Sequence, residues 1–213
     1  MDPLAFALGA AGAAWGIAAD RISARWPAHE DGSIRRIDWR TPVVAVFGAV
    51  AMAAVPSRFS DPAERALFGG LFAVLVLQMA TDLDQRLLPD LLTLPVVAVG
   101  VVVLVWGGDS LVNRQPALLA VGVAIGLPLM LYALSLPFGD GAFGEGDVKF
   151  LVGAGLLLGA LRLFIAVLVA AIVSGLVIGV LLATRRISLR SYIPLGPFLI
   201  IGTVWAVLLP ASS

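Results

Sequence analysis

Residues 148–184 read VKFLVGAGLLLGALRLFIAVLVAAIVSGLVIGVLLAT, and this stretch decides the fold class. Beyond Lys149 it contains one charged residue, Arg162. As a single helix it would be roughly 55 Å long at 1.5 Å per residue, which is too long for one crossing of a bilayer with an apolar core of about 30 Å. We therefore predict two membrane helices here, separated at residues 159–162.

Further apolar stretches on both sides of this one raise the predicted number of spans to eight. Hydrophobic residues make up 60% of the 213 residues, charged residues make up 13%, and the mean hydropathy is +1.02. Typical soluble domains contain roughly 45–50% and 25%, respectively, so a soluble protein of this length could not bury so much apolar surface. The sequence predicts an all-α, polytopic integral membrane helix bundle that forms a single domain over residues 1–213. The predicted spans are 3–19, 41–57, 66–81, 91–108, 115–139, 148–161, 163–184 and 191–211.

The basic residues are distributed unevenly between the two sides of this predicted bundle. If the N-terminus lies outside, ten of the fourteen Lys and Arg residues fall on one side of the membrane. Positive charge accumulates on the cytoplasmic side of membrane proteins, so this side is predicted to be cytoplasmic. Residues 20–40, the longest polar stretch, then form a short cytoplasmic loop.

Several classes of chemistry are excluded by the residues that the chain lacks. It has no cysteine and one histidine, His29, which excludes cysteine nucleophiles, thiolate metal sites, multi-histidine metal sites and nucleophile–imidazole catalysis. His29 is expected to be a solvated loop residue. Because the net charge is zero and there is no basic tract, no nucleic acid partner is expected.

Carboxylates gather in two segments that the predicted topology places on the cytoplasmic face. Residues 81–90 read TDLDQRLLPD and residues 139–149 read GDGAFGEGDVK. Two carboxylates held together can activate water for hydrolysis, because one accepts a proton from the water while the other donates one to the scissile carbonyl group. The simpler alternative is that each segment is a solvated turn. The acidic candidates are Asp82, Asp84, Asp90, Asp140, Glu145 and Asp147.

The glycines of the second acidic segment also match a nucleotide-binding pattern. Residues 139–144 fit G-x-G-x-x-G, but they follow a membrane helix rather than a strand, and no βαβ unit surrounds them. We expect these glycines instead to allow a sharp backbone turn and the close approach of a substrate.

Glycine pairs four residues apart also occur inside the spans. Such pairs let helix backbones approach closely, and we expect them to pack helices within the molecule rather than to form a dimer. The pairs are Gly12/Gly16, Gly122/Gly126, Gly155/Gly159 and Gly175/Gly179.

Three segments together resemble the type IV prepilin peptidases, the bacterial branch of the GxGD intramembrane aspartyl proteases. Residues 82–95, DLDQRLLPDLLTLP, are similar to the family's first signature, an Asp followed eight residues later by Pro-Asp or Pro-Asn at a helix start. Residues 144–149, GEGDVK, are similar to the second signature, G-x-G-D-x-K. Residues 192–198, YIPLGPF, resemble the I-P-x-G-P-F stretch that opens the family's last helix.

The resemblance implies cleavage of the basic leader from type IV pilin-like precursors at the cytoplasmic face of the bacterial plasma membrane, with no metal or cofactor. Carried over by position, the catalytic aspartates would be Asp82 and Asp147, with Asp84 a near rival for the first place. Acidic groups near the site would attract the basic leader; these are Asp84, Asp90, Asp140 and Glu145. The residues that would shape the site or bind substrate are Asp84, Asp90, Gly144, Glu145, Gly146 and Lys149.

The chain departs from the family between its first two spans. Many members carry a zinc-binding insert with two C-x-x-C pairs there, and many also methylate the new N-terminus of the pilin. Residues 20–40 contain no cysteine, so the zinc module is missing and methyl transfer is left open. Three alternatives remain at this point. One is an ion- or proton-coupled transporter, because paired carboxylates also make proton relays. The others are a non-catalytic membrane scaffold and a preflagellin- or presenilin-like peptidase with a different substrate.

Overall fold

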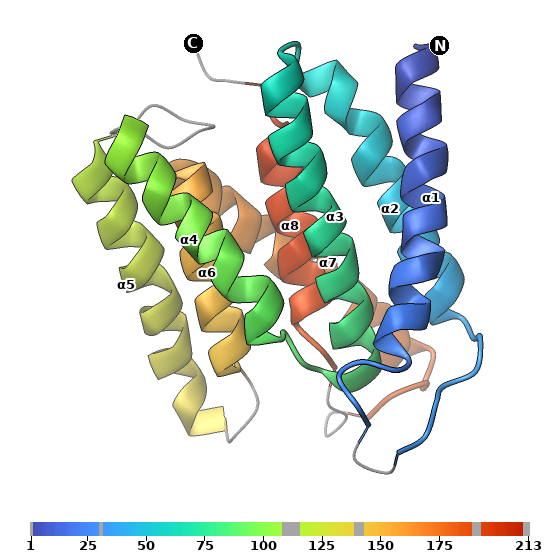
Figure 1. Ribbon diagram of the computed structural model, residues 1–213. Coiled ribbons are helices and arrows are strands. Elements are labelled where there is room, and N and C mark those ends of the chain that lie inside the picture. Colours follow the sequence, from blue (N-terminus) through green and yellow to red (C-terminus); the bar gives the residue numbers. More distant parts are fainter. Residues whose placement is uncertain (1, 30–31, 108–115, 139–142, 189–192, 211–213) are drawn as a thin grey trace. The chain divides into compact units, whose positions relative to one another are not determined.

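A computed structural model describes residues 2–29, 32–107, 116–138, 143–188 and 193–210. Within these ranges the chain forms eight α-helices and one short 3-10 turn, with no strand (Figure 1). The all-α prediction is therefore confirmed. The elements are α1 (Pro3–Ser23), α2 (Arg40–Arg58), α3 (Pro62–Gln85), α4 (Asp90–Gly107), α5 (Ala117–Ser135), η1 (Leu136–Phe138), α6 (Glu145–Leu158), α7 (Ala160–Ala183) and α8 (Gly196–Leu208).

Five helices are long and apolar enough to cross a membrane, namely α1, α2, α3, α5 and α7. Shorter apolar helices cover residues 90–102 and 196–208. Many of the large apolar side chains on the described helices are exposed; Phe6, for example, is 70% exposed. A helix that is apolar on all sides is stable where lipid replaces water. These features are those of a polytopic membrane helix bundle.

The predicted break inside residues 148–184 lies at Gly159. This residue has a φ of 78°, which residues with a Cβ atom rarely adopt, and it separates α6 from α7. The split of the long apolar run into two helices is confirmed. Arg162, in the first turn of α7, is buried and donates a hydrogen bond to the carbonyl oxygen of Ala206 in α8.

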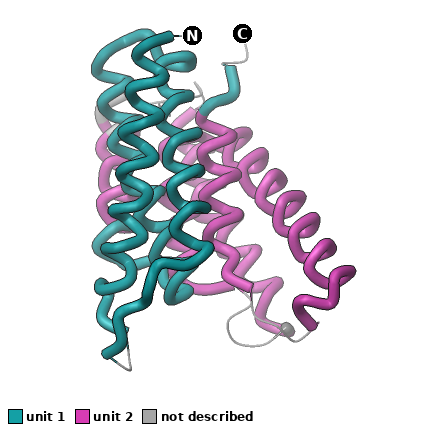
Figure 2. Tube along the Cα trace, turned by 90° about the vertical axis from the view of Figure 1, so that its right-hand side faces the viewer, with its two compact units in different colours: residues 1–92, 208–210 teal, residues 93–207, 211–213 magenta. Residues whose placement is uncertain are grey.

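The chain divides into two compact units (Figure 2). Unit 1 contains residues 1–92 and 208–210, and unit 2 contains residues 93–207 and 211–213. The expectation of a single domain over residues 1–213 stays a prediction.

In unit 1, the helices α1 and α2 pack at close range through glycine. A Cβ atom on Gly12 would lie 2.2 Å from the carbonyl oxygen of Gly48, and one on Gly16 would lie 2.5 Å from that of Val44. The predicted packing role of the Gly12/Gly16 pair is confirmed. The third helix, α3, is joined to α1 by the indole of Trp15, which donates to the carbonyl oxygen of Ala73 at 2.8 Å.

In unit 2, α5 and α6 pack through Gly155, on which a Cβ atom would lie 2.7 Å from that of Ala124. The other two glycine pairs behave differently, because a Cβ atom on Gly122, Gly126, Gly175 or Gly179 would meet no heavy atom within 4 Å. The expectation that these two pairs pack helices within the molecule is wrong for the part of the chain that the structure describes.

Two helices extend beyond the apolar runs that predicted them. The first was expected to end at residue 19 and the third at residue 81, but α1 continues to Ser23 and α3 to Gln85. The polar loop is accordingly residues 24–39 rather than 20–40. The physical reason is that the polar residues of the added turns, including Asp20 and Asp84, are held by ion pairs.

Candidate functional site

Asp82 lies in the last turn of α3. The helix begins after Asp61, whose carboxylate accepts hydrogen bonds from the backbone N–H groups of the first turn. It ends at Arg86, which has the left-handed φ of 57° and donates its N–H to the carbonyl oxygen of Asp82 at 2.9 Å. Asp82 is only 5% exposed, so the structure places the first candidate carboxylate in a largely buried position at a helix end.

Asp84, the alternative to Asp82 as the first catalytic residue, contacts basic side chains of the polar segment that precedes α2 and of its first residue. Its Oδ1 atom lies 2.6 Å from Nε of Arg35 and 3.4 Å from Nη1 of Arg40. Its Oδ2 atom lies 3.2 Å from Nε2 of His29. The Asp84 side chain is 2% exposed. A carboxylate with these partners has a structural role, which favours Asp82 over Asp84 as the first catalytic candidate.

Arg35 connects Asp84 to two further carboxylates. Its guanidinium group donates to Asp20, near the end of α1, and to Asp38 at 2.8 Å. Burial by itself would lower the pKa of Arg35, but the hydrogen bond and charge of Asp20, together with the charges of Asp84 and Asp38, raise that pKa above its ordinary value. We call this set of side chains the Arg35 cluster: Asp20, Arg21, His29, Arg35, Asp38, Arg40, Thr41 and Asp84.

The polar loop is also fastened to the last residue of α3. The amide nitrogen of Gln85 donates to the backbone carbonyl oxygen of Pro27 at 2.6 Å and to that of Ser23 at 3.3 Å. Together with the Arg35 cluster, these bonds attach residues 24–39 to the helical turn that carries Asp82.

The second candidate carboxylate, Asp147, lies in the first turn of α6. It occupies the third position of the helix, and its Oδ2 atom accepts a hydrogen bond from the backbone N–H of Gly144 at 3.1 Å. This is one half of a capping box; the reciprocal half requires a side chain that Gly144 does not have. The positive end of the helix dipole favours a carboxylate at this position.

The backbone at Gly144 does not require a glycine. Its φ of −87° and ψ of 160° are extended values that any residue adopts, and an added Cβ atom would lie no closer than 3.6 Å to its nearest neighbour, Oδ2 of Asp147. The expected sharp turn is therefore wrong at this position. Close approach of a substrate remains as the predicted reason for the glycine.

The remaining predicted residues are distributed along the same two segments. Asp90 and Glu145 are exposed first residues of α4 and α6, and Lys149 is half-buried in α6. Asp140 lies outside the described residues. The structure thus brings Asp82 and Asp84 into one helical turn of unit 1, and places Gly144, Glu145, Gly146, Asp147 and Lys149 around the start of one helix of unit 2.

Two expectations, one about the polar loop and one about the first acidic segment, are wrong. His29 is not a solvated loop residue, since its side chain is 18% exposed and lies beside Asp84. Asp84 is buried among cations, so it is not placed to attract a basic leader. Sequence reasoning missed the Arg35 cluster because its contacts join residues far apart in the chain, such as Arg35 and Asp84, which are 49 positions apart. The only signal was the mixture of Arg and Asp in a short segment.

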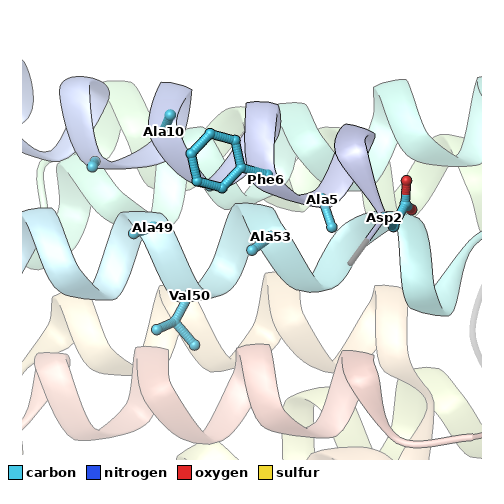
Figure 3. Close-up of a pocket in the computed structure, with 9 residues that line it drawn as sticks. Asp2, Ala5, Phe6, Ala10, Ala49, Val50 and Ala53 are labelled. Carbon is cyan, nitrogen blue, oxygen red and sulfur yellow. The ribbon is translucent and has the colours of Figure 1, made fainter.

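Other parts of the described chain offer no comparable set of acidic groups. No group of three His, Asp or Glu side chains suited to a metal ion occurs among the described residues. An apolar groove of about 550 Å³ lies between the N-terminal half of α1 and α2, lined by small residues such as Ala5, Gly9 and Ala53 (Figure 3). Its one titratable lining residue, Asp2, caps α1 by accepting from the N–H of Leu4.

Comparisons with known proteins identify the same segments. The model of the type IV leader peptidase family matches residues 69–180, which include both acidic segments. A prepilin leader peptidase/N-methyltransferase of Burkholderia pseudomallei (strain K96243) is 34% identical over 171 residues, covering 76% of this chain and 54% of the relative. The protein of the same name from Dickeya chrysanthemi is 30% identical over 183 residues, covering 81% of this chain and 61% of the relative.

The chain spans about half the length of the curated relatives it matches. No solved structure matches it. The relatives are at least 30% identical over most of the chain, and the family model covers more than half of it. The chain belongs to the type IV leader peptidase family.

Proposed function

We propose that this chain is a membrane-embedded aspartic endopeptidase that removes the basic leader from type IV pilin-like precursors. The observation that carries the proposal is the match of the family model to residues 69–180, because this range contains Asp82 and Asp147 in the two signatures. The names of the relatives, prepilin leader peptidase/N-methyltransferase, support the same substrate class.

Asp82 and Asp147 are the catalytic residues of this proposal. One carboxylate, ionised, accepts a proton from water while the water oxygen attacks the scissile carbonyl carbon; the other, protonated, donates its proton to the carbonyl oxygen. Collapse of the tetrahedral intermediate then breaks the C–N bond: the amine leaves with a proton from the first carboxyl group, and one hydroxyl of the intermediate returns its proton to the second carboxylate, which leaves a carboxylic acid product and restores both groups. No metal or cofactor takes part in this scheme.

Their positions on the helices support an assignment of roles. Asp147 lies in the first turn of α6, where the helix dipole favours an anion, whereas Asp82 lies in the last turn of α3, where the dipole disfavours one. The dipoles alone would make Asp147 the base and Asp82 the acid, whereas burial raises the pKa of Asp147, despite the hydrogen bond from Gly144, and acts against that assignment.

The site is proposed to face the cytoplasm at the bacterial inner membrane. In unit 1, the basic residues Arg21, Arg35 and Arg40 lie at the same end of the helices as Asp82, because they form the Arg35 cluster with Asp84. Basic residues accumulate on the cytoplasmic side. The exposed carboxylates Asp90 and Glu145 attract the basic leader of the precursor.

The transporter alternative finds no support in the described helices. A proton relay requires carboxylates within the membrane-spanning part of a bundle. Asp82 and Asp147 lie in terminal turns instead. A peptidase of preflagellin or presenilin type would differ from the proposed enzyme in the peptides it cleaves.

The test is cleavage by the purified protein in detergent or liposomes. A panel of peptides carrying a Lys/Arg-rich leader before an apolar segment is incubated with the parent chain, with Asp82→Asn and with Asp147→Asn, and the cut is located by mass spectrometry. Cleavage at the leader boundary by the parent alone supports the proposal. Absence of cleavage across the panel, or cleavage that survives both substitutions, contradicts it. A parallel incubation with a radiolabelled methyl donor determines whether the new N-terminus is methylated.

A further inference from the structure

The end of α3 is joined to two other helices through one arginine. Arg35 contacts Asp20 near the end of α1, Asp38 just before α2 and Asp84 in the last turn of α3. Asp38 in turn accepts a hydrogen bond from the backbone N–H of Arg40, at the start of α2, at 2.9 Å. The Arg35 side chain is therefore the point at which three helix ends of unit 1 are held together.

Asp20 makes this junction rigid. Its carboxylate is 1% exposed and also accepts hydrogen bonds from Nη2 of Arg21 and from the hydroxyl of Thr41 in α2, both at 2.6 Å. Three carboxylates of the cluster, Asp20, Asp38 and Asp84, are thus balanced by Arg21, Arg35 and Arg40. Loss of Arg35 would leave these three carboxylates short of one positive charge, which is costly for Asp20 and Asp84 because their side chains are buried.

The turn held in this way is the one that carries Asp82. The last turn of a helix lacks part of its backbone hydrogen bonding and opens more readily than the middle. Here the last turn is held through Asp84, two residues after Asp82, and through Gln85, which donates to the carbonyl oxygen of Pro27. The orientation of Asp82 therefore depends on contacts made by residues 24–39.

We propose that Arg35 is a positioning residue for peptide cleavage: by holding Asp84, it fixes the last turn of α3 and so orients the carboxyl group of Asp82. The inference rests on the proposed function, in which Asp82 is catalytic. The role requires arginine, because a planar guanidinium group reaches three carboxylates at once in a fixed geometry, whereas a lysine ammonium group is a flexible point charge.

The kinetic test compares Arg35→Gln, Arg35→Lys and the matched control Arg36→Gln. Arg36 is the next residue, carries the same charge, is exposed and contributes no side chain to the Arg35 cluster. We expect kcat on a leader peptide to fall on the order of 10²-fold in Arg35→Gln, as for a misplaced catalytic group, with KM changed less than about threefold. Arg35→Lys, which keeps the charge, should be intermediate, and Arg36→Gln should match the parent.

A second measurement reports the mobility of the end of α3 and does not require the protein to be active. Since the chain contains no cysteine, one spin label can be attached at Leu87→Cys, an exposed position just after α3, and another, in a separate sample, at Val50→Cys, an exposed position on α2. We expect Arg35→Gln to sharpen the spectrum of the label at position 87, as the turn becomes mobile, and to leave that at position 50 unchanged. If Arg35→Gln does not fold, the same two spectra are recorded for Arg35→Lys, which keeps the positive charge.

Each outcome decides between defined alternatives. Parent-like kcat in Arg35→Gln, an equal loss in Arg36→Gln, or a rise in KM at constant kcat would overturn the positioning role. An unchanged spectrum at position 87 in both Arg35 variants would contradict the inference that Arg35 fixes the last turn of α3. If the parent cleaves no leader peptide, the proposed function fails, while sharpening at position 87 alone would still establish that Arg35 holds the end of α3.

Discussion

The Oδ2 atom of Asp147 accepts a hydrogen bond from the backbone N–H of Gly144 at 3.1 Å, so this carboxylate closes the start of α6 while it faces the glycine segment of the second signature. The bond fixes the side-chain rotamer of Asp147 relative to its own helix. It leaves the carboxylate with further lone pairs for a water molecule. A capping role and a catalytic role are therefore compatible in the same side chain.

The first prediction separates these two roles of Asp147. In Asp147→Asn, the side-chain oxygen can still accept from Gly144, but proton transfer is lost, so we expect cleavage to fall by about 10²–10⁴-fold with little change in melting temperature. Asp82→Asn should do the same. The matched control is Asp61→Asn at the start of α3, where the carboxylate only caps the helix; it should cleave at the parent rate. Full activity in Asp147→Asn or Asp82→Asn would contradict the assignment of that residue.

A second prediction concerns the reason for glycine at position 144. Because its backbone is extended and an added Cβ atom meets nothing closer than 3.6 Å, Gly144→Ala should fold with a melting temperature like that of the parent. If a substrate backbone approaches this position, the methyl group should raise KM for the leader peptide roughly tenfold, as one misplaced methyl group commonly does. Gly70→Ala, on an open and exposed face of α3, is the control for both measurements. An unchanged KM would exclude close approach at Gly144.

The third prediction tests the attraction of a basic leader by the exposed carboxylates. Asp90→Asn and Glu145→Gln each remove one negative charge from an exposed helix start, so KM for a Lys/Arg-rich leader should rise severalfold at low salt, with a smaller difference at high salt because ions screen the attraction. Glu64→Gln, in the first turn of α3, removes the same charge at the opposite end of that helix from Asp82 and is expected to have no effect. An increase in KM that is independent of salt would argue against electrostatic attraction.

The fourth prediction concerns stability. A Cβ atom on Gly12 would lie 2.2 Å from the carbonyl oxygen of Gly48, so Gly12→Ala forces α1 and α2 apart and should lower the free energy of unfolding by about 1–3 kcal/mol. Gly122→Ala, with no heavy atom within 4 Å of the added group, should be neutral or slightly stabilising, because alanine favours helix over glycine by up to about 1 kcal/mol. Thermal unfolding in one detergent compares the two. Equal melting temperatures would contradict the close packing of α1 on α2.

Sequence reasoning succeeded where one dominant physical term decides the outcome. Apolar length and composition determine which segments form helices, and the break at Gly159 follows because one helix over residues 148–184 would be too long for one crossing. It failed where the outcome depends on which residues meet in three dimensions. The pair formed by Arg35 and Asp84 is 49 residues apart, and no local pattern distinguishes Asp84, bound by cations, from Asp82 two residues before it. The glycine pairs show the same limit, since Gly12/Gly16 meets a neighbouring helix and Gly122/Gly126 does not.

The last prediction is a bell-shaped dependence of cleavage on pH. A base must be ionised and an acid protonated, so kcat/KM should fall at low pH, when the base gains a proton, and again at higher pH, when the acid loses one. The dipoles of α6 and α3 favour an ionised Asp147 and a protonated Asp82, but each contributes only about 0.3–1 kcal/mol, less than the 1.36 kcal/mol of one pKa unit. Burial raises the pKa of Asp147 and acts against its dipole, so the dipoles do not decide the roles. If the two carboxyl groups act together as proposed, the apparent pKa values of the profile belong to the pair rather than to either residue.

The measurement uses a short soluble leader peptide, so that membrane docking of the substrate does not limit the rate. Protein held at each pH and then returned to neutral conditions reports any irreversible loss of activity. Asp61→Asn, whose carboxylate takes no part in the proposed reaction, should give the parent profile. The contradicting result is a flat profile from acidic to neutral pH, measured on enzyme that regains full activity at neutral pH. The rate would then not depend on the protonation state of either carboxyl group, so Asp82 and Asp147 could not act as an acid and base pair.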